Sequence, residues 1–421
     1  MKINKHCFDN GLRLVHHEDT GTQMVALNIV YDVGARDEHP EHTGFAHLFE
    51  HLMFGGSVNI PDYDTPLQLA GGENNAWTNN DITNYYLTVP KPNVETGFWL
   101  EADRMLGLAF SEQSLEVQRG VVMEEFKQRC LNQPYGDVGH LLRPLAYKVH
   151  PYRWPTIGKD LSHISQATLE EVKSFFYRFY APNNAVLAVT GNISWEETVR
   201  LTEKWFAPIP RREVPVRQLL QEPMQTEERR QTVERNVPLD ALFMVYHICS
   251  HDDADYYAYD ILSDILSNGR SSRMNRKLVQ EEKLFSNIEV YISGTRDAGL
   301  LHVSGKPAAG VSLEQAEAAV RKELDILTQS YVGEQELEKV KNKFESTQIF
   351  GNINYLNVAT NLAWFELTGQ AEDIDLEVER YRAVTAEWLH AVARKTFREE
   401  NCSVLYYKTP RSPEGEGGYS L

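Results

Sequence analysis

Two stretches of the chain carry the same succession of apolar segments, with a period of about 215 residues. The apolar positions of the matching segments agree, whereas several polar positions differ. The pairs are residues 26–31 with 241–246, 47–53 with 260–266, and 183–189 with 400–406. Each half therefore predicts a buried strand, a helix, further strands and helices, and a final strand.

This succession predicts an α+β fold of two similar domains related by internal duplication. Each domain is expected to be a mostly antiparallel sheet with helices packed on one face. The stretch from Pro208 to about Val237 is rich in Pro, Arg, Gln and Glu, which is typical of a surface linker. We expect domains over residues 1–212 and 237–421, joined by a linker over 213–236. The chain should open with a hairpin that turns at residues 9–11, Asp-Asn-Gly.

One helical stretch in the first half concentrates residues that can bind a metal. Thr43 is the expected N-cap of this helix, and apolar residues follow at helical spacing. His47 and His51 are four residues apart, so their imidazoles project from one side of consecutive turns and can share a zinc ion. Glu50 lies on the same side, where a base for the zinc-bound water is needed. The order H-x-x-E-H is known among zinc-protease signatures.

The alternative is a helix that carries two of the chain's 14 histidines by chance. The second half argues against it, because its equivalent positions are Asp260, Ser263 and Asp264. The helix is therefore tolerated without the two histidines and the glutamate, so packing does not require them. We expect one zinc ion per chain, held by a catalytic domain over 1–212, and a C-terminal repeat domain that binds no metal.

A catalytic zinc site needs a third protein ligand and one open position. The segment from Leu115 to Arg129 has a helical pattern and contains Glu124 and Glu125. Adjacent residues point about 100° apart on a helix, so only one of these glutamates can face the metal. The sequence pattern leaves the choice open, and either one can be an ordinary solvated carboxylate.

A glycine turn within residues 70–78 leads into an expected strand at Tyr85–Val89. A strand beside a zinc site can pair with an extended peptide, which would add a strand to the sheet. It can equally be an ordinary strand of a meander, and the sequence favours neither interpretation.

Composition narrows the possible partners. The formal net charge of −18 argues against nucleic acid, and it fits either basic peptide ligands or a surface adapted for solubility. The four cysteines are far apart and form no C-x-x-C pair, so neither a thiolate zinc site nor a disulfide framework is expected. No apolar run approaches the roughly 18 residues of a membrane span, and the first residues lack a signal-peptide core. A cytoplasmic location without a membrane partner is expected.

Taken together, these motifs resemble the pitrilysin and mitochondrial processing peptidase family of inverted-motif (HxxEH) zinc peptidases. The resemblance covers nearly the whole chain. The matching segments are residues 10–12, 34–38, 43–55, 75–78, 121–125, 150–152, 190–192, 271–273 and 297–300.

The resemblance implies that His47 and His51 are zinc ligands, that Glu50 is the catalytic base, and that Glu125 is the third ligand. It also implies two α+β domains related by a pseudo-twofold axis. Four such domains commonly enclose a chamber, so this half-length chain is expected to form a homodimer, or a heterodimer with a related subunit.

By the same resemblance, the chain is expected to be a zinc-dependent metalloendopeptidase that hydrolyses unstructured peptides inside a clamshell chamber. The alternative is a non-catalytic or partner-dependent subunit of a heteromeric peptidase. Substrate is expected to bind at Asn75, Ala76 and Trp77.

The chain departs from the family at Gln118, where many members have a glutamate seven residues before the third ligand. This change is expected to affect the rate rather than zinc binding. The family also holds substrate with an Arg and a Tyr of the second half, for which Tyr291 and Arg296 are the candidates.

Overall fold

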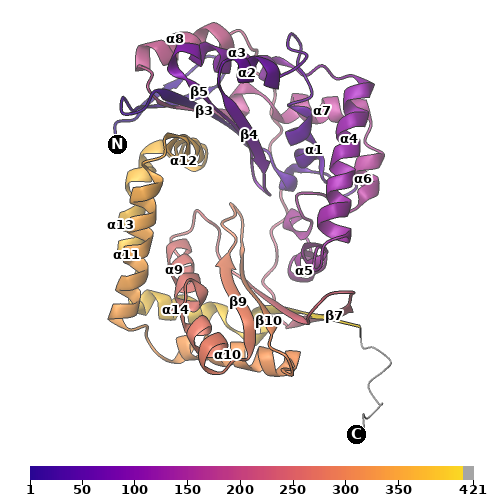
Figure 1. Ribbon diagram of the computed structural model, residues 1–421, viewed down its shortest axis with the longest axis vertical. Helices are drawn as coiled ribbons and strands as arrows, with labels where there is room; N and C mark the ends of the chain where they lie inside the picture. The colour runs from indigo at the N-terminus through magenta and orange to yellow at the C-terminus, as the bar shows by residue number, and fades with distance from the viewer. Residues whose placement is uncertain (411–421) are drawn as a thin grey trace, which may run out of the picture. The chain divides into compact units, whose positions relative to one another are not determined.

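A computed structural model describes residues 1–410 of the chain (Figure 1). Contacts between residues divide the chain into two units, and neither unit is one continuous stretch of sequence. The first unit contains Met1–Gln128, Val149–Gln221 and Asn342–Arg382. The second contains Arg129–Lys148, Glu222–Lys341 and the residues from Ala383 onward.

The first unit is built on a six-stranded sheet in the order β1-β2-β6-β3-β5-β4. Strands β2 and β6 run parallel, and all other neighbours run antiparallel. The strands are β1 (Asn4–Cys7), β2 (Arg13–Glu18), β3 (Met24–Tyr31), β4 (Glu73–Thr78), β5 (Thr83–Pro90) and β6 (Ala185–Gly191). The predicted hairpin is confirmed, because Gly11 has a φ of +88° and donates its N–H to the carbonyl of Phe8.

Helices cover one face of this sheet, as predicted. Strand residues such as Leu27 and Ile29 point into a large core with α1, α3, α7 and α8. The helices of the first unit are α1 (Phe45–Leu52), α2 (Asp64–Leu69), α3 (Val94–Leu106), α4 (Glu112–Phe126), α6 (Leu161–Ser165), α7 (Leu169–Phe179), α8 (Trp195–Phe206) and α12 (Tyr355–Thr368). Short 3₁₀ turns are η1 (Ala35–Asp37), η2 (Lys91–Asn93), η4 (Pro151–Arg153), η5 (Pro182–Asn184) and η7 (Ala371–Asp375).

The other face of the first sheet is covered by α12, a helix that comes from the second half of the sequence. The alternate strand residues Ala26 and Val30 pack there against Val358 and Leu362. A polar contact fixes the helix in place, because the Thr360 hydroxyl donates to the amide oxygen of Asn28 over 3.2 Å. This helix adds a layer that the periodicity of each half does not reveal.

The second unit has a five-stranded sheet in the order β7-β11-β8-β10-β9, with β7 and β11 parallel and the other neighbours antiparallel. Its strands are β7 (Arg229–Glu234), β8 (Ala241–His247), β9 (Phe285–Ile292), β10 (Leu300–Pro307) and β11 (Cys402–Lys408). Its helices include α5 (Val138–Ala146), α9 (Tyr256–Ser267), α10 (Leu313–Gln329) and α14 (Ala386–Thr396). Three helical segments contain a boundary between the two units: η3 (Lys127–Leu131, a π-helix), α11 (Glu334–Gly351) and α13 (Glu377–Ala383). The second unit also contains the short helices η6 (Asn275–Glu281) and η8 (Glu399–Asn401).

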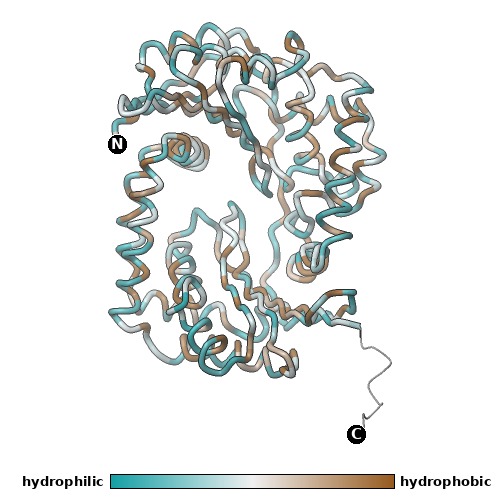
Figure 2. Tube along the Cα trace, viewed as in Figure 1, coloured by the Kyte–Doolittle hydropathy of each residue, from teal (hydrophilic) through white to brown (hydrophobic). Residues whose placement is uncertain are grey.

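The second sheet is also covered on both faces. Tyr147, next to α5, packs edge-on against His247, with ring centroids 5.2 Å apart. The neighbouring strand residue Tyr246 points the opposite way and meets Phe397, which follows α14. Helix α5 comes from the first half of the sequence, and Figure 2 shows hydrophobic residues along it.

The strand order and the single parallel pair recur in both sheets, which confirms the α+β class and the predicted duplication. Strand β3 corresponds to β8, and β6 corresponds to β11, as the sequence repeat indicates. The stretch predicted as a linker, 213–236, contains β7, an edge strand whose residues alternate between half-buried and exposed. None of the helices described in residues 1–410 has the length and hydropathy of a membrane span. A cytoplasmic location stays a prediction.

Candidate metal centre

Helix α1, which carries the H-x-x-E-H motif, begins after Gly44 and not after Thr43. Gly44 has a φ of +88°, and a Cβ atom there would lie 2.7 Å from Ile164 and 2.9 Å from the carbonyl of Ile157. Packing therefore requires a glycine at this cap position. The predicted Thr43 cap is wrong, because the Thr43 hydroxyl instead accepts the backbone N–H of Lys159 over 2.8 Å.

The apolar side of α1 anchors the helix in the core, and the two histidines lie on the other side of the helix, with His47 still buried. Phe49 stacks on Phe175 and Tyr180, with ring centroids 5.2 and 5.1 Å apart. The Tyr85 hydroxyl donates to the backbone carbonyl of Phe49 over 3.2 Å. On the opposite side, the imidazole rings of His47 and His51 have centroids 5.0 Å apart and planes at 89° to each other.

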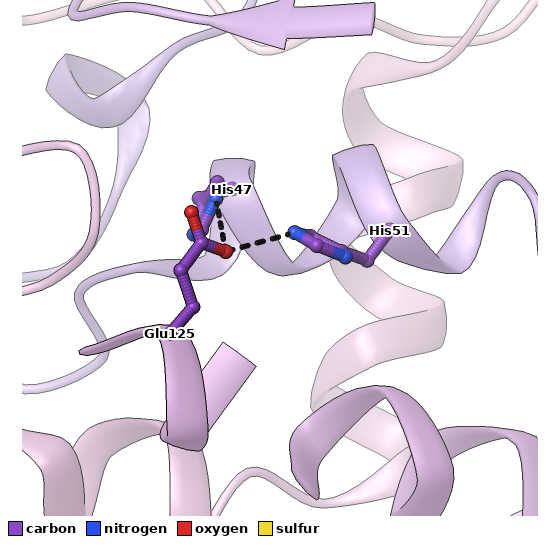
Figure 3. Close-up of side chains that lie close together, drawn as sticks. All are labelled: His47, His51 and Glu125. Atoms are coloured by element: carbon purple, nitrogen blue, oxygen red, sulfur yellow. Dashed lines mark ion pairs between the residues drawn. The ribbon is translucent and has the colours of Figure 1, made fainter. Parts of the chain in front are cut away.

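Helix α4 brings Glu125 to these two imidazoles. Its carboxylate Oε2 lies 3.4 Å from Nε2 of His47 and 3.3 Å from Nε2 of His51. Figure 3 shows the three side chains converging on one point from the two helices. Glu124, its neighbour, points away, with its side chain 56% exposed and 3.4 Å from the ammonium of Lys127. The geometry thus distinguishes the two glutamates that the sequence pattern leaves equivalent.

The three side chains have the donor set and the spacing of a zinc site. Two imidazole nitrogens and a carboxylate oxygen lie within 4.8 Å of one another. Zinc–ligand bonds of about 2.0 to 2.2 Å in a tetrahedron place neighbouring ligand atoms about 3.3 to 3.6 Å apart. The observed nitrogen–oxygen separations of 3.4 and 3.3 Å agree with this spacing. Among residues 1–410, no other group of three His, Cys, Asp or Glu side chains meets the same spacing, and the equivalent helix α9 contributes to none.

Glu50 projects from α1 beside the two histidines and is held by a residue of the sheet. The hydroxyl of Thr78, at the end of β4, donates to Oε2 of Glu50 over 2.7 Å. This bond fixes the carboxylate that the sequence assigns as the base. Thr78 lies within the Asn75–Thr78 segment that supports the family resemblance, but no sequence pattern indicates its contact with Glu50, because only the fold brings β4 to α1.

Strand β4 is the edge of the first sheet. It pairs with β5 on one side, and in the described part of the chain no strand pairs with its other side. The expected strand at Tyr85–Val89 lies within β5, which is enclosed between β3 and β4. Of the two interpretations left open by the sequence, the ordinary meander strand is therefore the one that holds. Asn75, Ala76 and Trp77 all lie on β4, with Asn75 and Trp77 on its exposed side.

The remaining candidates lie at different places in the fold. Gln118 lies on α4, two turns before Glu125, and its amide is close to Gly55 behind the end of α1. Tyr291 and Arg296 belong to the second unit. The Tyr291 ring stacks on His302, with centroids 4.7 Å apart. The role of Tyr291 and Arg296 in substrate binding stays a prediction.

Comparison with known proteins places this arrangement in a family. Residues 13–154, which contain the whole candidate metal centre, match the family described as insulinase, peptidase family M16. Residues 166–344 match the family described as peptidase M16 inactive domain. The chain belongs to peptidase family M16. The resemblance inferred from the sequence is thereby confirmed, and the name of the second match agrees with the absence of a metal-ligand group among the described residues of that stretch.

Proteins similar to this chain match it over nearly its whole length. The zinc protease PqqE of Helicobacter pylori is 26% identical over 408 residues, which are 95% of this chain and 91% of that protein. The crystal structure of a protease from Helicobacter pylori superposes with a TM-score of 0.92 at 26% identity, covering 97% of this chain and 99% of the other. The periplasmic protease PqqL from Escherichia coli shares the fold, with a TM-score of 0.80 and 18% identity. This M16 chain matches only 47% of that longer chain.

Family membership and the His47–His51–Glu125 group together identify the protein as an M16 metallopeptidase. The residues of one helix, and not the fold, determine which half of the chain carries the metal centre. Both halves build the same sheet, but only the first half has imidazoles on the helix that corresponds to α1.

Proposed function

We propose that the protein is a zinc-dependent metalloendopeptidase that holds one zinc ion per chain. The observation that carries this proposal is the convergence of His47, His51 and Glu125, whose ligand atoms all lie within 4.8 Å of one another, with Glu50 beside them. Three protein ligands leave one position open, which is the arrangement of catalytic rather than structural zinc sites.

The side chains of this centre divide the work of peptide hydrolysis. Zinc, when bound, lowers the pKa of a water molecule and polarises the scissile carbonyl. Glu50 accepts a proton from the attacking water while the new carbon–oxygen bond forms. It then delivers that proton to the leaving amine as the carbon–nitrogen bond breaks. The Thr78 hydroxyl keeps the Glu50 carboxylate oriented during both transfers.

The edge of β4 is the proposed binding site for the substrate backbone. An extended peptide can add to this edge through main-chain hydrogen bonds, with side chains contacting Asn75, Ala76 and Trp77. Because β4 ends at Thr78, a peptide on this edge runs toward Glu50 and presents a carbonyl to the metal. Only an unfolded segment can pair in this way, since local unfolding of a folded protein costs several kcal/mol.

A second chain is proposed to complete an enclosed chamber. The match takes in 97% of this chain and 47% of PqqL, so that longer protein contains a further stretch of about the same length. A second copy of this chain, or a related subunit, would supply the equivalent of that stretch. The complete set of three ligands and a base favours an active enzyme over a non-catalytic subunit.

The decisive experiment treats the purified protein with a mixed library of flexible peptides. We expect cleavage that a chelator abolishes and that added zinc restores, while a folded domain containing a cleaved sequence stays intact. The Glu50→Gln variant is the matched control for a contaminating protease. Failure to cleave any peptide, with zinc bound and the protein dimeric, would contradict the proposal. Activity that emerges only on mixing with a related chain would instead identify a partner-dependent subunit.

A further inference from the structure

Glu38 is a buried carboxylate at the beginning of the helix that carries the metal centre. It follows the turn η1 and is 6% exposed. It belongs to the Gly34–Glu38 segment that supports the family resemblance, and the proposed chemistry gives it no role.

The Glu38 carboxylate accepts hydrogen bonds from three N–H donors. The backbone N–H of Gly44 donates to Oε2 over 3.0 Å, and that of Ala46 donates to Oε1 over 2.9 Å. The indole N–H of Trp154 donates to Oε2 over 3.1 Å. Both carboxylate oxygens are thus engaged, and two of the donors are backbone groups at the N-cap and in the first turn of α1.

Helix α1 has no side-chain cap at its own N-terminus, because its N-cap is Gly44, which has no side chain to accept the first N–H groups of the helix. Such groups need an acceptor when they are buried, and the N-terminal end of a helix favours a negative charge. Burial raises the pKa of Glu38, and the N–H groups of Ala46, Gly44 and Trp154 oppose this rise because they favour the carboxylate.

The capped turn is the turn that bears the first metal ligand. His47 is the third residue of α1 and directly follows Ala46. Because α1 is only eight residues long, a loosened first turn displaces a large part of the helix. An error of about 1 Å in a ligand position is enough to impair a metal or catalytic site.

We propose that Glu38 is a positioning residue for the metal centre: by holding the N–H groups of Gly44 and Ala46, it fixes the direction in which His47 presents Nε2. This inference rests on the proposed zinc function. It goes beyond that function because it assigns a role in metal binding to a residue that does not touch the metal.

The test is a titration of the metal-free, full-length protein with cobalt(II), whose visible absorption reports its coordination geometry. We expect Glu38→Gln to weaken cobalt binding by about 10- to 100-fold, the usual range for residues that orient metal ligands. The absorption bands of the cobalt bound to this variant should also shift. The amide that replaces the Glu38 carboxylate cannot accept from all three N–H donors, so the first turn of α1 loosens and His47 changes its position at the metal. Trp154→Phe, which leaves both bonds to α1 in place, should bind cobalt with almost the parent affinity.

Ser312→Ala is the matched control, because Ser312 caps α10 in the second unit by accepting the N–H of Gln315. It should lower the melting temperature without changing the cobalt affinity or spectrum. Parent affinity and spectrum in a folded Glu38→Gln protein would overturn the inference. If that variant fails to fold, Glu38→Asp, which keeps the charge but shortens the reach, decides by the same readout. Absence of cobalt binding by the parent protein would instead defeat the proposed function.

Discussion

Replacing Glu125 by alanine should remove the metal, whereas replacing its neighbour Glu124 should not. Zinc sites with four protein ligands bind with about 10 to 16 kcal/mol, which is about 2.5 to 4 kcal/mol per ligand when divided evenly. Glu125→Ala is therefore expected to weaken zinc binding by about 10²- to 10³-fold. Glu124 faces solvent beside Lys127, and an exposed ion pair of this kind contributes about 0 to 1 kcal/mol. Glu124→Ala should thus leave the zinc affinity within about tenfold of the parent.

The assay is competition for zinc between each metal-free variant and a chromophoric chelator of known affinity. Circular dichroism of both variants confirms that the helices are retained. Glu125→Gln is a useful third variant, because it keeps the shape of the side chain but offers a neutral oxygen. If Glu124→Ala loses zinc and Glu125→Ala retains it, α4 is rotated by one residue from the arrangement described here, and the ligand assignment is refuted.

Three further predictions follow from other contacts. Glu50→Gln should keep one zinc ion per chain, measured by metal analysis. Its peptide cleavage should fall by about 10²- to 10⁴-fold, because an amide cannot accept the proton of the attacking water. Two zinc ions per chain, or substantial turnover, would contradict the assignment of Glu50 as the base. Arg104→Met should destabilise the first unit by about 3 to 5 kcal/mol in urea denaturation, since it leaves the fully buried Glu101 carboxylate without its ion-pair partner; the double variant Glu101→Gln, Arg104→Met should recover part of that loss. Burial alone would raise the pKa of Glu317, but hydrogen bonds from Arg230, Tyr406 and Arg321 lower it to about 2. Its charged form therefore stabilises the second unit above the unfolded pKa of 4.5, and this stabilisation should disappear as the pH falls toward 2, with a smaller pH dependence in Glu317→Gln.

The sequence predicted the parts of the site that depend on spacing within one helix. His47, Glu50 and His51 share a side of α1 because four residues span about one turn. The choice of Glu125 over Glu124 depends on how α4 is rotated against α1, and no pattern within α4 determines that rotation. Only the family resemblance selected the residue that the structure brings to the histidines.

The sequence predicts neither the true helix cap nor the edge strand, because both depend on contacts between segments that are distant in the sequence. Thr43 has the residue type of a helix cap, but contacts with residues more than 100 positions away make Gly44 the cap and leave the acceptor role to Glu38. The sequence pattern does not show which of the two neighbouring strands forms the edge, because the β4 residues Glu73–Thr78 are mostly polar and alternate between exposed and half-buried. The edge position of β4 emerges only when the order of the whole sheet is known.

The exchange of helices between the two halves has a consequence for synthesis of the chain on the ribosome. Strand β6 completes the first sheet at Gly191, but α12, which covers the second face of that sheet, ends at Thr368, roughly 180 residues later. At about 5 to 20 residues per second, the nascent chain exposes Val15, Ala26 and Val30 for about 9 to 36 seconds. During this interval we expect the apolar face to bind chaperones or to aggregate. Nascent chains that stop before residue 355 should therefore remain bound to chaperones, whereas chains that extend past α12 should be released.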